Sequence, residues 1–147
     1  MGLVKALIKC KEAPNIELHA QFNPKELQVD KTVSWTPSSS HGEDPMVEFK
    51  EPQSATLSVT LYFDTYETKD DVYDRYVKGL EKMVVMEPSL GRPPLVIFQW
   101  GNFNFTGVVE SLGQKYTMFL EDGKRCRCEV AFKMRSASGA KVSARKP

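Results

Sequence analysis

The stretch Ser54–Phe63, SATLSVTLYF, decides the fold class, because apolar and polar residues alternate along it from Thr56 onward. Leu57, Val59 and Leu61 alternate with serine, threonine and tyrosine. A period of two is typical of a β-strand with one dry face and one polar face. The polar face carries only hydroxyl groups, so it suits either a solvated surface or the lining of a wet channel.

Similar patterns place further strands on both sides of this stretch. Apolar residues at three- and four-residue spacing predict one helix from Asp70 to about Met86, with Thr68 as a candidate N-cap and Gly79 at a close packing contact. The expected strands cover residues 3–10, 16–22, 27–35, 95–100, 103–112, 114–120 and 124–134, with a bulge expected at Gly113. We therefore predict a mainly β fold with one flanking α-helix (α+β).

The segment from Thr36 to Pro52 reads as a long loop, because it holds three prolines and three consecutive serines. Met46 and Phe49 are too apolar for a simple linker, and long loops in compact domains are usually functional or mobile. One interpretation is an arm that becomes ordered against a neighbouring subunit, and the other is a floppy surface loop. Lys31 interrupts the apolar face of the preceding strand, so we expect it at an edge or an interface.

The composition bounds the class of protein. The chain has 147 residues, enough for one domain, with 20 basic and 19 acidic residues and a net charge of +1. This balance gives no long-range attraction to nucleic acid or to an anionic membrane. No apolar run approaches the roughly 18 residues that span a bilayer. The sequence thus predicts neither a nucleic-acid partner nor a membrane partner.

The three cysteines do not form a recognisable metal site. An odd count without a secretory signal favours reduced thiols in the cytosol. Cys126 and Cys128 are separated by one residue, whereas paired zinc ligands usually have at least two residues between them. His19 and His41, the two histidines, lie far from them in the sequence. We therefore expect buried thiols, no metal and no cofactor.

Motifs for catalysis are also absent from the sequence. It contains no GxSxG, HExxH or GxGxxG pattern and no glycine loop that would cradle a phosphate. Arg125, Arg127 and Lys133 could meet phosphate, but Glu129 lies among them and no aromatic residue alternates with them for base stacking. The sequence therefore predicts a structural or assembly protein, not an enzyme.

Five stretches in order resemble one family. They are Phe22–Leu27, Leu57–Thr65, Pro93–Gly101, Phe105–Ser111 and Tyr116–Gly123. Together they make the chain similar to the tube-type N-terminal domain of baseplate tube-initiator proteins in contractile injection systems, which are phage-tail-like particles. The resemblance covers residues 1–135, and we expect residues 136–147 to be a disordered basic tail or a linker stump.

The resemblance implies a fold and a role. Members look like phage tail-tube proteins, with a β-sandwich or barrel and a flanking helix. They form a hexameric ring that joins the spike or hub to the stacked inner tube, and they contact the inner-tube protein and other baseplate proteins. The particle would be assembled in the cytoplasm and released. In such members a LysM module often follows the domain, and none follows before Pro147, so a stand-alone adaptor and a chain cut at its linker both stay open.

The sequence is also compatible with two other functions. One is a tail-tube or adaptor protein of a contractile-tailed phage, and the other is a small β-barrel module that binds a peptide or carbohydrate. By analogy with ring-forming relatives, the candidate inter-subunit residues are Lys31, Met46 and Phe49. The candidate lumen-facing residues are Gln28, Asp30, Thr32, Thr56, Ser58, Thr60, Arg125, Arg127 and Glu129.

Overall fold

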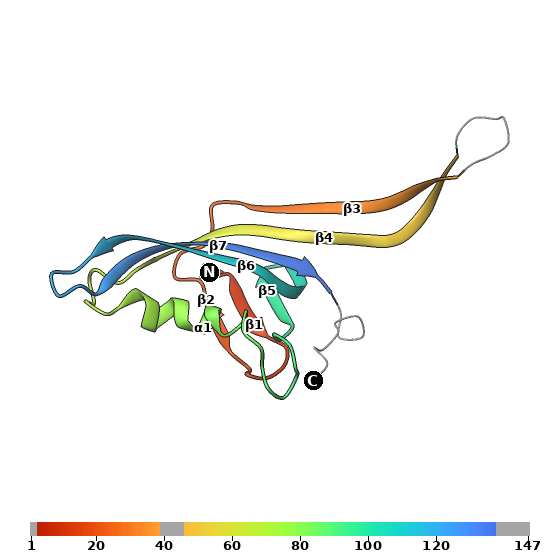
Figure 1. The fold of residues 1–147 in the computed structure, drawn as a ribbon. Helices are drawn as coiled ribbons and strands as arrows, with labels where there is room; N and C mark the ends of the chain where they lie inside the picture. The colour runs from red at the N-terminus through yellow and green to blue at the C-terminus, as the bar shows by residue number, and fades with distance from the viewer. Residues whose placement is uncertain (1–2, 39–45, 138–147) are drawn as a thin grey trace.

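The structure, a computed structural model, describes residues 3–38 and 46–137. Its strands are β1 (Leu7–Cys10), β2 (Glu17–His19), β3 (Leu27–Ser38), β4 (Met46–Asp64), β5 (Val96–Trp100), β6 (Phe103–Phe119) and β7 (Arg125–Ser136). They form one antiparallel sheet in the order β2-β1-β5-β6-β7-β4-β3, shown in Figure 1. The mainly β fold with one helix is confirmed, and the sheet is open, so no barrel closes within one chain.

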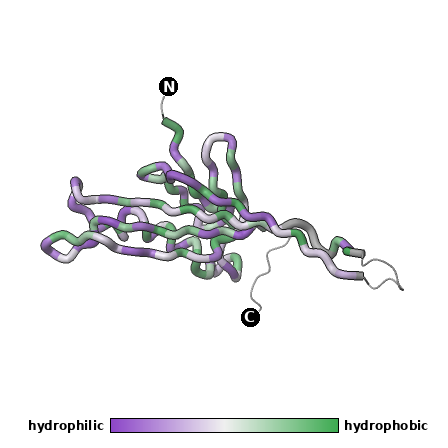
Figure 2. Tube along the Cα trace, turned by 90° about the horizontal axis from the view of Figure 1, so that it is seen from above, coloured by the Kyte–Doolittle hydropathy of each residue, from purple (hydrophilic) through white to green (hydrophobic). Residues whose placement is uncertain are grey.

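The central strands β4 and β7 have the two faces that their sequences predict. Leu57, Val59 and Leu61 of β4 and Val130 and Phe132 of β7 are buried, whereas the residues that alternate with them lie on the opposite face. The alternation of apolar and polar colours along these strands is visible in Figure 2. Burial of such apolar side chains contributes roughly 1.5–3 kcal/mol each. The dry face therefore anchors the hydrophobic core.

The core lies between this dry face and the helical segment. The sheet curls so that β5, β1 and β2 lie on the same side of it as the helix (Figure 1). Val77, Leu80 and Met83 from the helical side pack into one cluster with Leu57, Phe98 and other buried sheet residues. Among the residues that the structure describes, none forms a layer over the opposite face of β4 and β7 (Figure 1).

The helix is shorter than predicted. A π-helical turn, η1 (Tyr73–Val77), leads into α1 (Lys78–Glu81), and the chain leaves the helix before Met86. Met83 and Val84 still pack on the core from a turn, so the apolar spacing continues beyond the helix. The N-cap prediction for Thr68 is wrong, because the Asp71 carboxylate accepts hydrogen bonds from the Tyr73 and Asp74 N–H groups.

Two glycines are placed by close contacts. A Cβ at Gly79 would lie 3.0 Å from Leu18, which confirms the predicted close packing of the helix on the sheet. Gly107 pairs with Val96 of β5 and with Ser136 of β7, so β6 changes partner at this residue. A Cβ at Gly107 would lie 1.9 Å from the Arg135 carbonyl oxygen, so only glycine fits at this corner.

The bulge predicted at Gly113 is wrong. Gly113 pairs regularly with Ala131, and the register shifts between Val109 and Ser111 instead. Residues 103–119 therefore form one strand, not two. The turns after Trp100 and Leu120 lie where predicted, with Gly101 and Gly123 at positive φ.

The long loop predicted over residues 36–52 is mostly strand. Residues 36–38 extend β3 and residues 46–52 begin β4, and the two strands pair from Ser38 with Met46 inward. Pro37 is tolerated because β3 is an edge strand, where a missing N–H breaks no ladder. Figure 1 shows the β3–β4 ribbon projecting beyond the rest of the sheet, and we call its residues 31–38 and 46–55 the arm. Within the segment 36–52, residues 39–45 fall outside the described residues.

The C-terminal prediction lies mostly outside the described part of the chain. Ser136 ends β7, and its hydroxyl accepts a hydrogen bond from the Ala55 N–H at 3.0 Å. Residues 138–147 of the expected tail are not described. In the ranges 3–38 and 46–137, no helix is long and apolar enough to cross a membrane.

Candidate functional site

The candidate site is the polar face of four strands, β3, β4, β7 and β6. The register of β4 and β7 sets Ser58 beside Lys133, Thr60 beside Ala131 and Tyr62 beside Glu129. All of these residues belong to the face opposite the core, because their strand neighbours are buried. The predicted residues Thr56, Ser58, Thr60, Arg127 and Glu129 therefore share one surface.

Strand β3 extends the same surface. Gln28 pairs with Ser58, Asp30 with Thr56 and Thr32 with Ser54. The Gln28 amide donates to the Asp30 carboxylate at 3.0 Å, which holds both side chains along the strand. The structure thus brings eight of the nine predicted lumen-facing residues to one face: Gln28, Asp30, Thr32, Thr56, Ser58, Thr60, Arg127 and Glu129.

Arg125 is the exception, and the prediction that it shares a face with Arg127 and Glu129 is wrong. Its guanidinium lies 3.3 Å from the Asp71 carboxylate. It also lies over the rings of Tyr73 and Tyr116, at 4.7 and 5.2 Å from their centroids. The register shifts near Met118 take β7 out of regular pairing at this end, so strict alternation no longer assigns the side chain.

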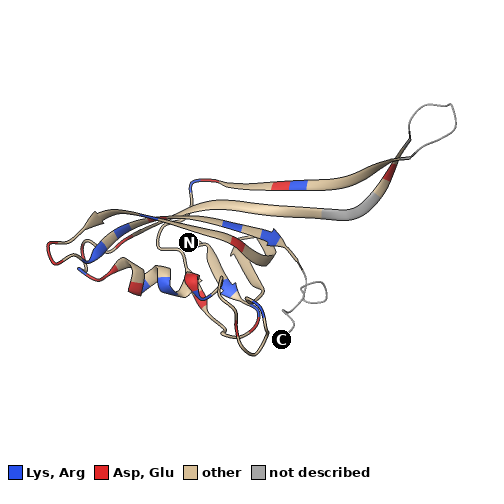
Figure 3. Ribbon diagram, in the orientation of Figure 1, with Lys and Arg blue, Asp and Glu red and all other residues tan. Residues whose placement is uncertain are grey.

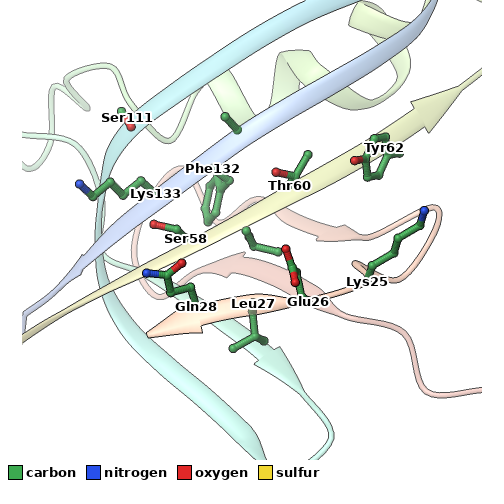
Figure 4. A pocket seen from close by; sticks show the side chains of 12 residues that line it. Lys25, Glu26, Leu27, Gln28, Ser58, Thr60, Tyr62, Ser111, Phe132 and Lys133 are labelled. Atoms are coloured by element: carbon green, nitrogen blue, oxygen red, sulfur yellow. The ribbon is translucent and has the colours of Figure 1, made fainter. Parts of the chain in front are cut away.

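The polar face contains a broad open depression, shown in Figure 4. Gln28 of β3, Ser58 and Thr60 of β4, and Lys133 of β7 lie around it. Its volume is about 740 Å³. Its lining combines hydroxyl and amide groups with apolar residues, and Lys25, Glu26 and Lys133 are its charged groups. Such a surface can hydrogen-bond to water and to passing polar groups, but it offers no nucleophile paired with a base.

Charges on this face are balanced by short cross-strand contacts. Arg127 bonds Asp64 at 3.0 Å, and Arg135 bonds Glu110 at 2.9 Å. The Arg135 hydrogen bond lowers the pKa of Glu110. Figure 3 shows both signs interspersed along the sheet. Because these pairs are solvent-exposed, they contribute little to stability and mainly neutralise charge on the surface.

The opposite face carries a polar network that sequence reasoning missed. Tyr73 donates to Glu81, Gln114 donates to the other Glu81 oxygen at 2.8 Å, and Tyr116 donates to Gln114 at 2.7 Å. The hydrogen bond from Tyr73 is the main cause that lowers the pKa of Glu81. Burial raises the pKa of Tyr116 to about 12. The network joins the helix to β6, and no local sequence pattern links its members.

A second missed contact joins the ends of two loops. The Arg92 guanidinium binds both carboxylate oxygens of Glu12, at 2.8 and 2.9 Å, and the Leu95 N–H donates to Glu12 at 2.7 Å. The hydrogen bonds from Arg92 and Leu95 lower the pKa of Glu12 to about 2. This pair fixes the segment after β1 to the segment before β5. Its residues are 80 positions apart, so spacing could not reveal it.

Neither thiol chemistry nor metal binding is supported by what the structure describes. Cys10, Cys126 and Cys128 are free and buried. Burial raises the pKa of the Cys10 and Cys128 thiols, which lowers their thiolate fraction. Across residues 3–38 and 46–137, no three His, Cys, Asp or Glu side chains gather where they could hold a metal ion.

The predicted inter-subunit residues lie on β3 and the arm. Lys31 is exposed on β3 opposite Ala55, and Phe49 is exposed on the arm opposite Trp35. Met46 begins β4 opposite Ser38, and its side chain is not among those described. Trp35 and Phe49 are each 56% exposed, although their rings pack edge to face at 5.5 Å. The arm therefore presents aromatic surface that the described part of this chain does not cover.

Comparison with known proteins identifies a protein family. The family model described as contractile injection system tube protein matches residues 4–145. A search of curated proteins finds no match.

Proposed function

The chain belongs to the contractile injection system tube protein family, and we propose that it forms a hexameric ring that acts as the tube initiator. In this role it joins the spike or hub to the stacked inner tube and contacts the inner-tube and baseplate proteins. The family is a structural one, which agrees with a non-enzymatic role. The particle is assembled in the cytoplasm before release.

One observation carries the proposal of a ring. Strands β6, β7, β4 and β3 form a four-stranded segment with one dry face, one polar face and a free edge on each side. In the described residues, β3 pairs only with β4, and residues 108–119 of β6 pair only with β7. Free edges invite pairing with another chain, and ring closure removes them.

The strand directions are compatible with such closure. Successive strands in the segment are antiparallel, so β3 and β6 run in opposite directions. In a ring with rotational symmetry, β3 of one copy would therefore meet β6 of the next in antiparallel orientation. A continuous antiparallel barrel results, with the core and helix of each copy outside it. The uncovered polar face then lines the lumen.

The arm supports contact between copies in a second way. An isolated two-stranded ribbon is marginally stable in water, so a long arm with exposed aromatic residues needs a partner surface. Val33 is 37% exposed and Val47 is 58% exposed, which extends the apolar strip beside Trp35 and Phe49. We propose that the arm packs on a neighbouring subunit in the assembled tube, with Lys31, Met46 and Phe49 at that interface.

The lumen can be tested by thiol labelling of Ser58→Cys in assembled tubes stripped of their sheath. We expect a bulky maleimide to label position 58 in the free chain and to be excluded after assembly. Lys78→Cys, exposed on the helix, is the matched control and should stay reactive in both states. The native thiols are buried and give little background. Equal labelling of position 58 before and after assembly would contradict the proposal.

The initiator role is tested by copy number. Quantitative mass spectrometry of purified particles should find one ring of this chain per particle, independent of particle length. A copy number that rises with tube length would identify a stacked tube protein instead. Cells lacking the gene should produce no sheathed particles, and intact particles from such cells would exclude an essential initiator role.

A further inference from the structure

A groove runs along the free edge of β6 on the helix side. Its volume is about 470 Å³. The turn after the helix contributes Val84 and Val85, and the latter is 55% exposed. Strand β6 contributes Glu110, Ser111, Leu112 and Gln114, and the Glu110 carboxylate is already paired with Arg135. The groove therefore combines apolar walls with the carboxylate of Glu81, which also lines it.

Glu81 makes this groove anionic. Hydrogen bonds from Tyr73 and Gln114 stabilise its charged form and lower its pKa, so it is ionised at neutral pH. Among the ion pairs found in the described ranges, none involves Glu81. A cation with an apolar stem would complement both the charge and the walls of the groove.

Lys31, on the free edge of β3, is such a cation with an apolar stem. It lies on the dry side of β3 between Val29 and Val33, which follows from its pairing with Ala55. It is exposed, and no ion pair within the described ranges involves it. A charge inside an apolar stripe on an edge strand discourages unspecific pairing, and it is matched only by a partner with an opposite charge.

Strand alternation restricts how the two edges can pair. The residues of β3 on the core-facing side of the sheet have odd numbers. On β6, after the register shift between Val109 and Ser111, the core-facing residues have even numbers. One antiparallel register that keeps the dry faces together sets Lys31 opposite Gln114, within reach of Glu81. The same register sets Val33 opposite Leu112 on the dry face and Asp30 opposite Lys115 on the polar face.

The neighbouring registers lose both charge contacts. A shift by two residues sets Lys31 opposite Leu112 or Tyr116, and it sets Asp30 opposite Gly113 or Thr117. Opposite charges directly across a strand pair are stabilising, whereas a lysine against apolar groups is left without a partner. Only one of these three registers satisfies Lys31 and Asp30 together.

We propose that β3 of one copy of this chain adds to the β6 edge of the next copy in this register, with Lys31 and Val33 filling the groove beside Glu81. The inference rests on the proposed ring and specifies its interface. Lys31 is thereby an inter-subunit contact that selects the register, and Asp30 bridges to Lys115 of the partner at the lumen surface.

The register is tested by disulfide trapping in particles purified from cells that produce the complete injection system. Thr32→Cys with Gly113→Cys places two thiols directly opposite each other, and a Cβ at Gly113 fits because it would lie 3.4 Å from Ala131. Mild oxidation should produce a ladder of linked chains on a non-reducing gel. Gln28→Cys with Gly113→Cys is the matched control, four residues out of register, and should stay monomeric on the gel.

A charge exchange provides a second measurement. Asp30→Lys alone and Lys115→Asp alone should each lower the yield of particles several-fold, and the double variant should restore it. A ladder from the control pair, or no ladder from either pair in particles that contain the chain, would overturn the register and leave the ring intact. If the purified particles do not contain the chain, both the proposed ring and the proposed register are wrong.

Discussion

The two halves of β4 have the same secondary structure in different surroundings. Residues 56–64 have β7 on one side, and their apolar side chains are buried under the helix. Residues 46–55 pair only with β3, and Val47 and Phe49 remain exposed. One part of this strand thus buries its apolar side chains in the core of its own chain. The other part, in the arm, leaves them exposed. The difference indicates which residues stabilise the subunit and which are available for assembly.

The largest expected contrast is between two phenylalanines. Phe132→Ala removes a ring that is 1% exposed and should lower the free energy of unfolding by about 3–5 kcal/mol. Phe49→Ala removes a ring that is 56% exposed and should change it by less than about 1 kcal/mol. Urea unfolding followed by circular dichroism measures both. Similar losses from the two variants would mean that the arm is part of the folded core.

A second contrast separates two glycines of β6. Gly107→Ala should lower the free energy of unfolding by about 2–3 kcal/mol, because the new Cβ would strike the Arg135 carbonyl. Gly113→Ala should lie within about 0.5 kcal/mol of the parent, since its Cβ makes only an ordinary contact with Ala131. Thermal unfolding of the two variants checks this, and equal melting temperatures would refute the corner at Gly107.

The third contrast concerns acid sensitivity. The folded pKa of Glu12 is about 2 against an ordinary 4.5, so its contribution to stability is present above pH 4.5 and is lost as the pH falls toward 2. Glu12→Gln should therefore lower the free energy of unfolding by about 2 kcal/mol at neutral pH and by progressively less in acid.

The matched control for this measurement is Glu110→Gln. Its pair with Arg135 is more exposed than the Glu12–Arg92 pair, so the loss of stability at neutral pH should be much smaller than for Glu12→Gln. Urea titrations between pH 2 and pH 7 compare the two variants. A constant difference between Glu12→Gln and the parent across this range would contradict the assigned role of the ion pair.

The smallest expected effect on folding comes from the arm. Trp35→Ala should change the free energy of unfolding by no more than about 0.5 kcal/mol, because its ring is 56% exposed and packs edge to face on the equally exposed ring of Phe49. Assembly should nevertheless fall strongly, as measured by negative-stain electron microscopy of particles. Glu48→Ala, one position from Phe49 on the arm, is the control and should assemble normally. Normal assembly of Trp35→Ala would remove the arm from the interface.

Local pattern was sufficient for most of the sheet. Alternation in Ser54–Phe63 predicted which side chains of β4 are buried, because the period of a strand does not depend on what the strand pairs with. It failed for Arg125, where irregular pairing with β6 and the nearby Asp71 decide the side-chain position. The three- and four-residue spacing of apolar residues also predicted a helix that is too long, to Met86. Residues of a turn can pack on the core with the same spacing as those of a helix.

By itself the sequence determined the two-faced strands, the one helical segment, the hairpin turns and the family, since these depend on neighbours along the chain. Only the tertiary structure decided that residues 36–38 and 46–52 belong to the arm and not to a loop. The strand pairing between them overrides the local preference of proline and serine for loops. It also decided that β3 and residues 108–119 of β6 each keep an unpaired edge among the described residues. It likewise brought together Glu12 and Arg92, which are 80 positions apart. These contacts join segments that are distant in the sequence, so they stabilise the protein only after the sheet has brought the segments together.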